Sequence, residues 1–160
     1  MRRTDRAVTD YQQINSIIEQ AKVVHIGMID NDRPYVVPMQ YGFVFADGQL
    51  TLYVHCAKEG RKLDIISKNP RVFIEVETEA AIISGGDIPC KYGSEYASVM
   101  GDGTAIVVED AAEKIFGLQL LMKTQTSRDF EITAQMATSV TVLRIDVPHV
   151  AAKSRTKTYS

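Results

Sequence analysis

The chain contains no tryptophan, only two cysteines and no marked excess of charge of either sign. Cys56 and Cys90 lie far apart with no second pair, so neither a disulfide framework nor a zinc site is expected. The formal net charge of −2 gives no reason to expect nucleic acid, whose binders usually carry a basic patch. No apolar run is long enough to cross a bilayer, and the start of the chain does not resemble a signal peptide. We therefore expect a cytoplasmic protein without a membrane, nucleic-acid or metal partner.

The composition is that of an ordinary globular protein, with 45% hydrophobic and 24% charged residues over a length of 160. This length fits one domain with a substantial core, and we treat residues 1–160 as that domain. Alternating apolar and β-branched residues predict strands over Val23–Asp30, Pro34–Phe45, Leu50–His55, Val72–Glu77, Tyr96–Val108 and Ser139–Val150. The segment between Ala80 and Ser94 is interpreted as a loop that joins two strands.

Helices are expected where capping residues precede apolar residues at helical spacing. Thr9 and Asp110, each followed three residues later by Gln or Glu, form two capping boxes. A third, short helix is predicted from Glu59 to the Asn69-Pro70 boundary. Asp47-Gly48 is a strong hairpin signal, and paired glycines at Gly101-Asp102-Gly103 indicate a bulge or bend. Since the helices are too few for a repeating βαβ chain, we predict a mainly β fold with flanking α: an antiparallel barrel with helices at its ends.

The most informative segment joins the third predicted strand to the short helix. It presents a histidine at the strand end, a glycine, and an Arg-Lys pair at the helix start; its candidate residues are His55, Lys58, Gly60, Arg61 and Lys62. The first N–H groups of a helix have no intrahelical partner and favour anions. A planar guanidinium beside an ammonium suits the oxygens of a phosphate monoester. The alternative interpretation is a solvated corner with ordinary surface charge.

Other reactive residues have simpler interpretations. Cys56 is treated as a small buried side chain, because neighbours in a strand point to opposite faces and it would not meet His55. His25 is expected to be structural, and His149 carries little information. The basic segment Lys153–Lys157 is interpreted as a solvated terminus. Pro38 cannot donate to a ladder, which suggests a sheet edge or a bulge.

Taken in order, four segments resemble a known family. They are Arg2–Arg6, Tyr35–Met39, Tyr53–Lys62 with Asn69–Val72, and Tyr96–Gly103. They are similar to the FMN-binding split barrels related to pyridoxamine 5'-phosphate oxidase, in particular to the nitroimidazole-reductase or nitroimidazole-resistance branch. The resemblance implies a homodimer of six-stranded split β-barrels with two FMN sites at the subunit interface.

The resemblance also implies roles for individual residues. Arg61 and Lys62 match the residues that hold the phosphate, and Ser98 matches a position that hydrogen-bonds the cofactor. In related split barrels a C-terminal lysine can approach the cofactor phosphate or the partner subunit, which makes Lys153 a reserve candidate. His55 matches a histidine beside the flavin and is the tentative catalytic residue. The backbone that matches the flavin-facing strand comprises Val37, Pro38, Met39 and Gln40.

The function implied is that of an FMN-dependent oxidoreductase. It would take hydride from NAD(P)H, or electrons from another donor, and pass them to a small organic acceptor such as a nitroaromatic. His55 would orient the substrate or donate a proton. The alternative is a non-catalytic flavin- or haem-binding module, a carrier or sensor, with His55 or His149 as axial ligand. Oxidation of pyridoxamine phosphate is a weaker third possibility, because no cationic set for a second phosphate is evident. Asp102 would be unfavourable beside a flavin phosphate, and without tryptophan the chain lacks an aromatic cluster to stack on the ring.

Overall fold

The computed structural model describes residues 4–155. Its α-helices are α1 (Tyr11–Gln20), α2 (Arg61–Lys68), α3 (Ala111–Thr126) and α4 (Ala134–Thr138), with short 3-10 turns at Thr4–Arg6 and Pro89–Lys91. Its strands are β1 (Ala7–Val8), β2 (Val24–Asp30), β3 (Arg33–Met39), β4 (Gly42–Ala46), β5 (Gln49–Cys56), β6 (Arg71–Glu77), β7 (Ala81–Ile83), β8 (Gly93–Val107), β9 (Thr141–Val147) and β10 (Ala151–Arg155). The predicted mainly β fold is confirmed. Arg2, Arg3 and Lys157 lie outside the described residues.

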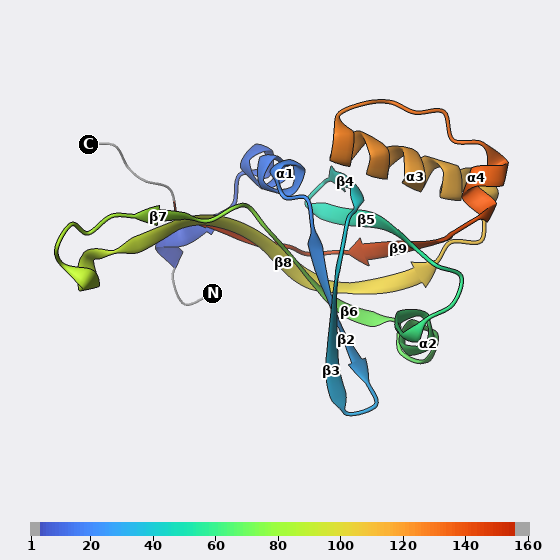
Figure 1. Ribbon diagram of the computed structural model, residues 1–160, viewed down its shortest axis with the longest axis horizontal. Coiled ribbons are helices and arrows are strands. Elements are labelled where there is room, and N and C mark those ends of the chain that lie inside the picture. Colours follow the sequence, from blue (N-terminus) through green and yellow to red (C-terminus); the bar gives the residue numbers. More distant parts are fainter. Residues whose placement is uncertain (1–3, 156–160) are drawn as a thin grey trace.

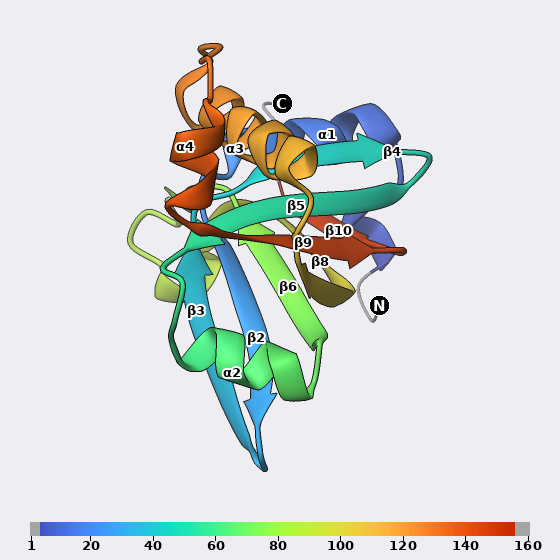
Figure 2. The ribbon, with the colours of Figure 1, turned by 90° about the vertical axis from the view of Figure 1, so that its right-hand side faces the viewer.

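The strands pair antiparallel in the order β3-β2-β6-β8-β9-β5-β4, and β10 runs beside β8 with β1 on its other side. The sheet curls into an open barrel, with α1, α3 and α4 above it and α2 at the opposite end (Figures 1 and 2). The two end strands, β3 and β4, follow each other directly in the chain, yet each pairs on one side only. The barrel is therefore split between them, and the path has more strands than the six expected.

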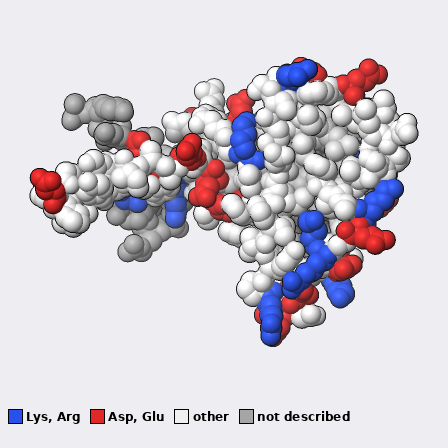
Figure 3. All heavy atoms as spheres, viewed as in Figure 1, with Lys and Arg blue, Asp and Glu red and all other residues white. Residues whose placement is uncertain are grey.

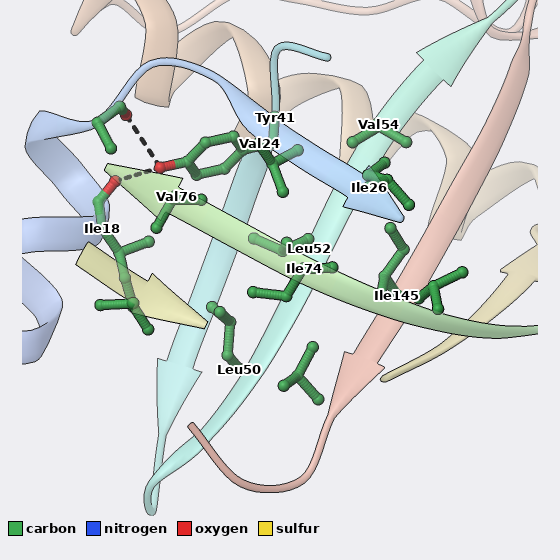
Figure 4. Close-up of a cluster of buried hydrophobic side chains, with 14 of the residues drawn as sticks. Ile18, Val24, Ile26, Tyr41, Leu50, Leu52, Val54, Ile74, Val76 and Ile145 are labelled. Atoms are coloured by element: carbon green, nitrogen blue, oxygen red, sulfur yellow. Dashed lines mark hydrogen bonds between the residues drawn. The ribbon is translucent and has the colours of Figure 1, made fainter. Parts of the chain in front are cut away.

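The core follows from the alternation of the strands. On β2, for example, Val24, Ile26 and Met28 are buried while the residues between them face outward. Figure 4 shows the centre of this core, where branched aliphatic side chains from β2, β5, β6 and β9 interdigitate beneath α1. The side chains that are less than 2% exposed include Ile18, Ile26, Leu50, Leu52, Val54, Ile74, Val76, Leu143 and Ile145.

Tyr41 fastens α1 over this core. Its hydroxyl donates toward two carbonyl oxygens at the end of α1, at 2.6 Å from that of Ile18 and 2.9 Å from that of Ala21 (Figure 4). The last carbonyls of a helix lack intrahelical partners, so this fully buried hydroxyl satisfies groups that water does not reach. Burial raises the pKa of the Tyr41 hydroxyl. The residue thus ties the connection between β3 and β4 to the first helix.

The other side of the same connection packs against α3. A side-chain carbon on Gly42 would lie 2.2 Å from the backbone nitrogen of Leu121, so only glycine lets the helix approach this closely. Gln125 of α3 donates to the carbonyl of Tyr41 at 2.9 Å. The prediction of a single strand over Pro34–Phe45 is therefore wrong. The segment is interrupted at Gln40 and Tyr41, because the chain there turns inward between two helices.

A charged network holds α3 to the outside of β5 and β9. Arg144 bonds Glu113 at 2.8 Å and Asp146 at 3.0 Å, and the Tyr53 hydroxyl donates to Glu113 at 3.1 Å. Burial and then the bonded Glu113 carboxylate raise the pKa of Tyr53 to about 12. Glu113 therefore points to the sheet, while its own N–H is capped by the Asp110 carboxylate, as predicted.

Two local predictions are wrong. Helix α1 is capped by Asp10, whose carboxylate accepts the N–H of Gln13 at 2.9 Å, and not by Thr9; a charged acceptor makes the stronger cap bond. The glycines of β8 do not interrupt the strand, which stays in register with β6 throughout. The glycines instead leave room for the turn from β9 to β10, because a side-chain carbon on Gly101 would lie 2.6 Å from the carbonyl oxygen of His149 in that turn.

The predicted loop and the predicted solvated tail both contain strand residues. Within Ala80–Ser94, β7 pairs with the start of β8 and forms a hairpin arm that projects from the barrel, at the left of Figure 1. Residues 153–155, expected in a solvated terminus, belong to β10 and pair with β8. Among residues 4–155, no helix is both long and apolar enough to cross a membrane.

Replacing the Tyr41 hydroxyl tests how much the fold depends on it. Tyr41→Phe should lower the free energy of unfolding by about 1–3 kcal/mol, because it leaves buried helix-end carbonyls without a donor. Urea unfolding with an unchanged m-value measures this loss. Tyr92→Phe, on a side chain that is 50% exposed, is the matched control and should change stability by less than about 0.5 kcal/mol. Equal effects of the two substitutions would contradict this role for Tyr41.

Candidate functional site

The corner between β5 and α2 leaves backbone donors available. Gly60 is the N-cap residue of α2 with φ 146°, a conformation that side chains other than glycine rarely adopt, and no side chain caps the helix. The N–H groups of Leu63 and Asp64 both bond the Gly60 carbonyl. The N–H groups before them in the first turn have no intrahelical acceptor, as at any helix start. This corner has the local form expected of an anion site.

Arg61, the first residue of α2, is held in place by two strands. Its Nε and Nη2 lie 2.9 Å and 2.8 Å from the same oxygen, Oδ2 of Asp30 at the end of β2. Its guanidinium carbon lies 4.4 Å from the ring centroid of Tyr35 on β3. The Arg61 side chain is nevertheless 58% exposed, so it remains accessible from solvent. The start of α2 is thus placed beside the β2–β3 hairpin.

Lys62 lies on the other side of this corner, close to the end of β5. Burial raises the pKa of the Cys56 thiol, and the nearby Lys62 ammonium opposes that rise. Cys56 is a buried side chain, as expected, and Cys90 is exposed in the arm. Lys58 is exposed in the connection that leads to Gly60. Together with Arg61, these lysines give the corner three cations.

The strand expected to face the flavin is a sheet edge. β3 pairs with β2 alone, which confirms the edge indicated by Pro38. The side chains of Val37 and Met39 pack against the core, while Pro38 and Gln40 are exposed. What these residues can offer a ligand is therefore mainly their backbone on the unpaired side.

His55 lies on the outer face of β5, opposite Val142 of β9. It is exposed, and within residues 4–155 its ring makes no side-chain hydrogen bond. Its ring nitrogens therefore do not cap the end of the strand. Of the other histidines, His149 is also exposed, whereas Nδ1 of His25 lies 3.3 Å from Oε2 of Glu75, as expected of a structural residue.

Ser98 lies elsewhere in the molecule. It is 8% exposed on β8, between Glu77 of β6 and Lys153 of β10. Val99, the next residue in the chain, pairs with Val76 of β6, which in turn pairs with Val24 of β2. Val24 and Asp30 are the two ends of the seven-residue strand β2. At ~3.3 Å per residue, roughly 20 Å separates the level of Val99 from the Arg61 corner. Within one chain, Ser98 and Arg61 therefore do not belong to one cluster.

The outer face of β2, β3 and β6 carries an apolar hollow. Its exposed side chains include Ile29, Val36 and Phe73, which are 48%, 57% and 45% exposed. A cavity of about 380 Å³ lies among them and is also lined by Arg71 and Asp102. Asp102 points to this outer face, whereas Asp30 and Tyr35 alternate in register with the inward-facing residues of their strands. Asp102 and the Arg61 corner are therefore on opposite faces of the sheet.

Next to this hollow, the His25 ring contacts the Glu75 carboxylate across β2 and β6, with 3.3 Å between Nδ1 and Oε2. Burial raises the pKa of Glu75, Glu77 adds to the rise, and His25 opposes it. Charges of both signs also gather over α2 and the tip of the β2–β3 hairpin, at the lower edge of Figure 3. Among the described residues, no group of three or more His, Cys, Asp or Glu is placed to hold a metal ion.

The geometry can now be compared with known proteins. The family model described as pyridoxamine 5'-phosphate oxidase matches residues 10–154. The chain belongs to this family. Among curated proteins, no match is found. The matched segment includes every residue of the candidate site, from the β2–β3 hairpin to Ser98.

Solved structures agree with this assignment. A protein from Bacteroides thetaiotaomicron, provisionally assigned to 5-nitroimidazole antibiotic resistance, is 30% identical, with a TM-score of 0.78 over 92% of this chain and 86% of that one. The flavocytochrome Anf3 of Azotobacter vinelandii is 20% identical, with a TM-score of 0.74 over 98% and 72%. A FAD-binding protein of Mesorhizobium loti is 21% identical, with a TM-score of 0.64 over 94% and 98%. The resemblance to the split barrels is confirmed, and the last two share the fold.

Two residues at the corner were not found from the sequence. Asp30 was interpreted only as the end of a strand, and Tyr35 only as part of a motif. Both contact Arg61 across more than 25 positions of sequence, and no local pattern links a hairpin to a distant helix start. The curvature of the barrel brings them together, so only the fold could reveal the contact.

Proposed function

We propose that the protein is an FMN-dependent oxidoreductase that acts on a small organic acceptor. The observation that carries this proposal is Arg61, held at the uncapped start of α2 beside the unpaired edge of β3. Phosphate donors and a free strand edge are two things a flavin mononucleotide requires, and here they adjoin. Membership of the pyridoxamine 5'-phosphate oxidase family supports the same conclusion.

The residues present fit such a cofactor. Arg61 and Lys62, with Lys58 and the N–H groups that follow Gly60, would hold the phosphate. The backbone of Val37–Gln40 would lie along the ring system and supply hydrogen-bonding groups from the unpaired side of β3. When bound, FMN supplies the hydride and electron transfer, and the protein supplies binding and orientation.

His55 is the residue we propose for the substrate side. It is exposed and its ring nitrogens are free of side-chain partners in the described chain, so it can form a hydrogen bond with a substrate or transfer a proton to it. The same freedom favours the alternative of a haem-binding module, in which His55 would be an axial ligand. A FAD- and haem-binding protein of Mycobacterium smegmatis has a related fold, which supports this alternative.

We further propose that the active form is a homodimer. The apolar hollow around Ile29, Val36 and Phe73 is the kind of surface that a second copy covers. In a homodimer, Ser98 and Lys153 of one chain, which lie roughly 20 Å from the Arg61 corner of that chain, could approach a flavin held by the other chain. A single chain therefore offers the two halves of the expected site at separate places, and a pair of chains can join them.

The cofactor is tested first, by absorption spectra of the protein with FMN, with FAD and with haemin, followed by NADH. The wild type should bind FMN, and Arg61→Ala with Lys62→Ala should weaken binding by roughly 10- to 1,000-fold, since charge-assisted contacts contribute about 1.5–3 kcal/mol each and need not add. Lys68→Ala, at the other end of α2, is the control and should bind normally. Unchanged affinity in the double variant would remove the phosphate assignment, and a Soret band without flavin binding would favour the haem module.

A second prediction concerns His55. His55→Ala should leave FMN affinity unchanged and lower turnover of a nitroaromatic acceptor by about 10²-fold or more, the range for loss of a general acid. The control is His149→Ala, which removes another exposed histidine. Steady-state rates at saturating NADH give the comparison. Normal turnover in His55→Ala would make this histidine dispensable for the reaction.

The dimer is tested by placing a charge in the hollow. Val36→Asp should shift the protein toward monomer in sedimentation experiments and weaken FMN binding together with it, because a buried unpaired carboxylate is costly. Met136→Asp changes a side chain of similar exposure, 53%, on α4 and should affect neither property. A Val36→Asp protein that stays dimeric would place the interface elsewhere, and a monomeric one that still binds FMN normally would show that each chain suffices.

A further inference from the structure

We propose that Asp30 is a positioning residue for flavin phosphate, acting through Arg61. It fixes the guanidinium so that one edge is used internally and another edge faces the ligand. This inference rests on the proposed FMN site and extends it to a residue on a different element, the β2–β3 hairpin.

The hydrogen-bond geometry divides the donors of Arg61. Nε and Nη2 both bond Oδ2 of Asp30, at 2.9 Å and 2.8 Å, which uses the side edge of the planar group. A guanidinium has five N–H donors in a rigid fork, so those of Nη1 and the second one of Nη2 remain. These remaining donors form the end edge, which can bind two phosphate oxygens at once.

Asp30 is itself well placed to act as a fixed support. Its side chain is 25% exposed, and its other oxygen, Oδ1, accepts a bond from the Asn31 amide at 3.3 Å. The ring of Tyr35 lies against the guanidinium, with 4.4 Å between its centroid and the Arg61 Cζ. Three elements, β2, β3 and α2, therefore define where an otherwise exposed side chain points. A long side chain that is already ordered loses less rotamer freedom when it binds.

The same carboxylate also has an unfavourable effect on an anion. A negative charge next to Arg61 repels a phosphate, although exposure to solvent weakens that repulsion. Orientation and charge can be separated here because both hydrogen bonds end on a single oxygen. The amide oxygen of asparagine has nearly the same position and can accept both bonds, so Asp30→Asn retains the support and removes the charge.

The experiment measures FMN and riboflavin affinities of the full-length wild type, Asp30→Ala and Asp30→Asn. Asp30→Ala should weaken FMN binding roughly 2- to 10-fold, the cost of ordering one long side chain, and leave riboflavin binding unchanged because riboflavin has no phosphate. Asp30→Asn should bind FMN at least as tightly as the wild type. In an Arg61→Ala background, Asp30→Ala should have no further effect on FMN affinity.

Each contrary result has a definite meaning. FMN affinity that is unchanged in Asp30→Ala would overturn the inference alone. An equal loss for FMN and riboflavin would also overturn it, because a general disturbance of the hairpin does not distinguish the two ligands. The inference fails as well if Asp30→Asn is as weak as Asp30→Ala, or if the Asp30→Ala effect persists without Arg61. A wild type that binds neither flavin would refute the proposed function itself, and this inference with it.

Discussion

The arrangement of this barrel depends on the inward turn at Tyr41 and Gly42. The Tyr41 hydroxyl donates to carbonyl oxygens at the end of α1, and the lack of a side chain on Gly42 allows the backbone of α3 to pack against the start of β4. Together they draw the chain away from the sheet between β3 and β4, so those strands end up at opposite edges although they adjoin in sequence. The unpaired edge of β3 is thus a consequence of helix packing. If β3 were not an edge strand, the backbone N–H and C=O groups of Val37–Gln40 would be hydrogen-bonded to a second neighbouring strand.

Patterns that reside in a few neighbouring residues were predictable. The hairpin at Asp47-Gly48 has both residues at positive φ, as its sequence requires, and Asp110 caps α3. Errors arose where a distant element decided the outcome. The break at Tyr41 depends on two helices, and the continuity of β8 through Gly101 depends on the turn at His149. Likewise, the corner was found from its own residues, while Asp30 and Tyr35, which position its arginine, were not. The resemblance to a family supplied Ser98, which lies roughly 20 Å from the corner within one chain.

The site also illustrates how exposed charges can be ordered. An isolated surface ion pair contributes little to stability, and the pair between Arg61 and Asp30 is 58% and 25% exposed. Its significance lies in geometry, because the Tyr35 ring restricts the guanidinium from a further direction. An anion that binds there meets a donor edge already in place. The cost of ordering is borne when the chain folds, so it does not reduce the affinity for the ligand.

The distribution of apolar residues over the outer face bears on assembly. Where α3 covers the sheet, the outward residues of β5 and β9 are bonded or packed beneath it, as in the Tyr53–Glu113–Arg144 network. On the outer face of β2, β3 and β6, by contrast, Ile29, Val36 and Phe73 have about half their surface exposed. Register fixes these side chains outward, since a slip by one residue would exchange both faces. Strands that face water on one side usually carry polar residues there. An apolar row at this place, continuous with the unpaired edge of β3, is the observation behind the proposed homodimer, in which a second copy would cover the row.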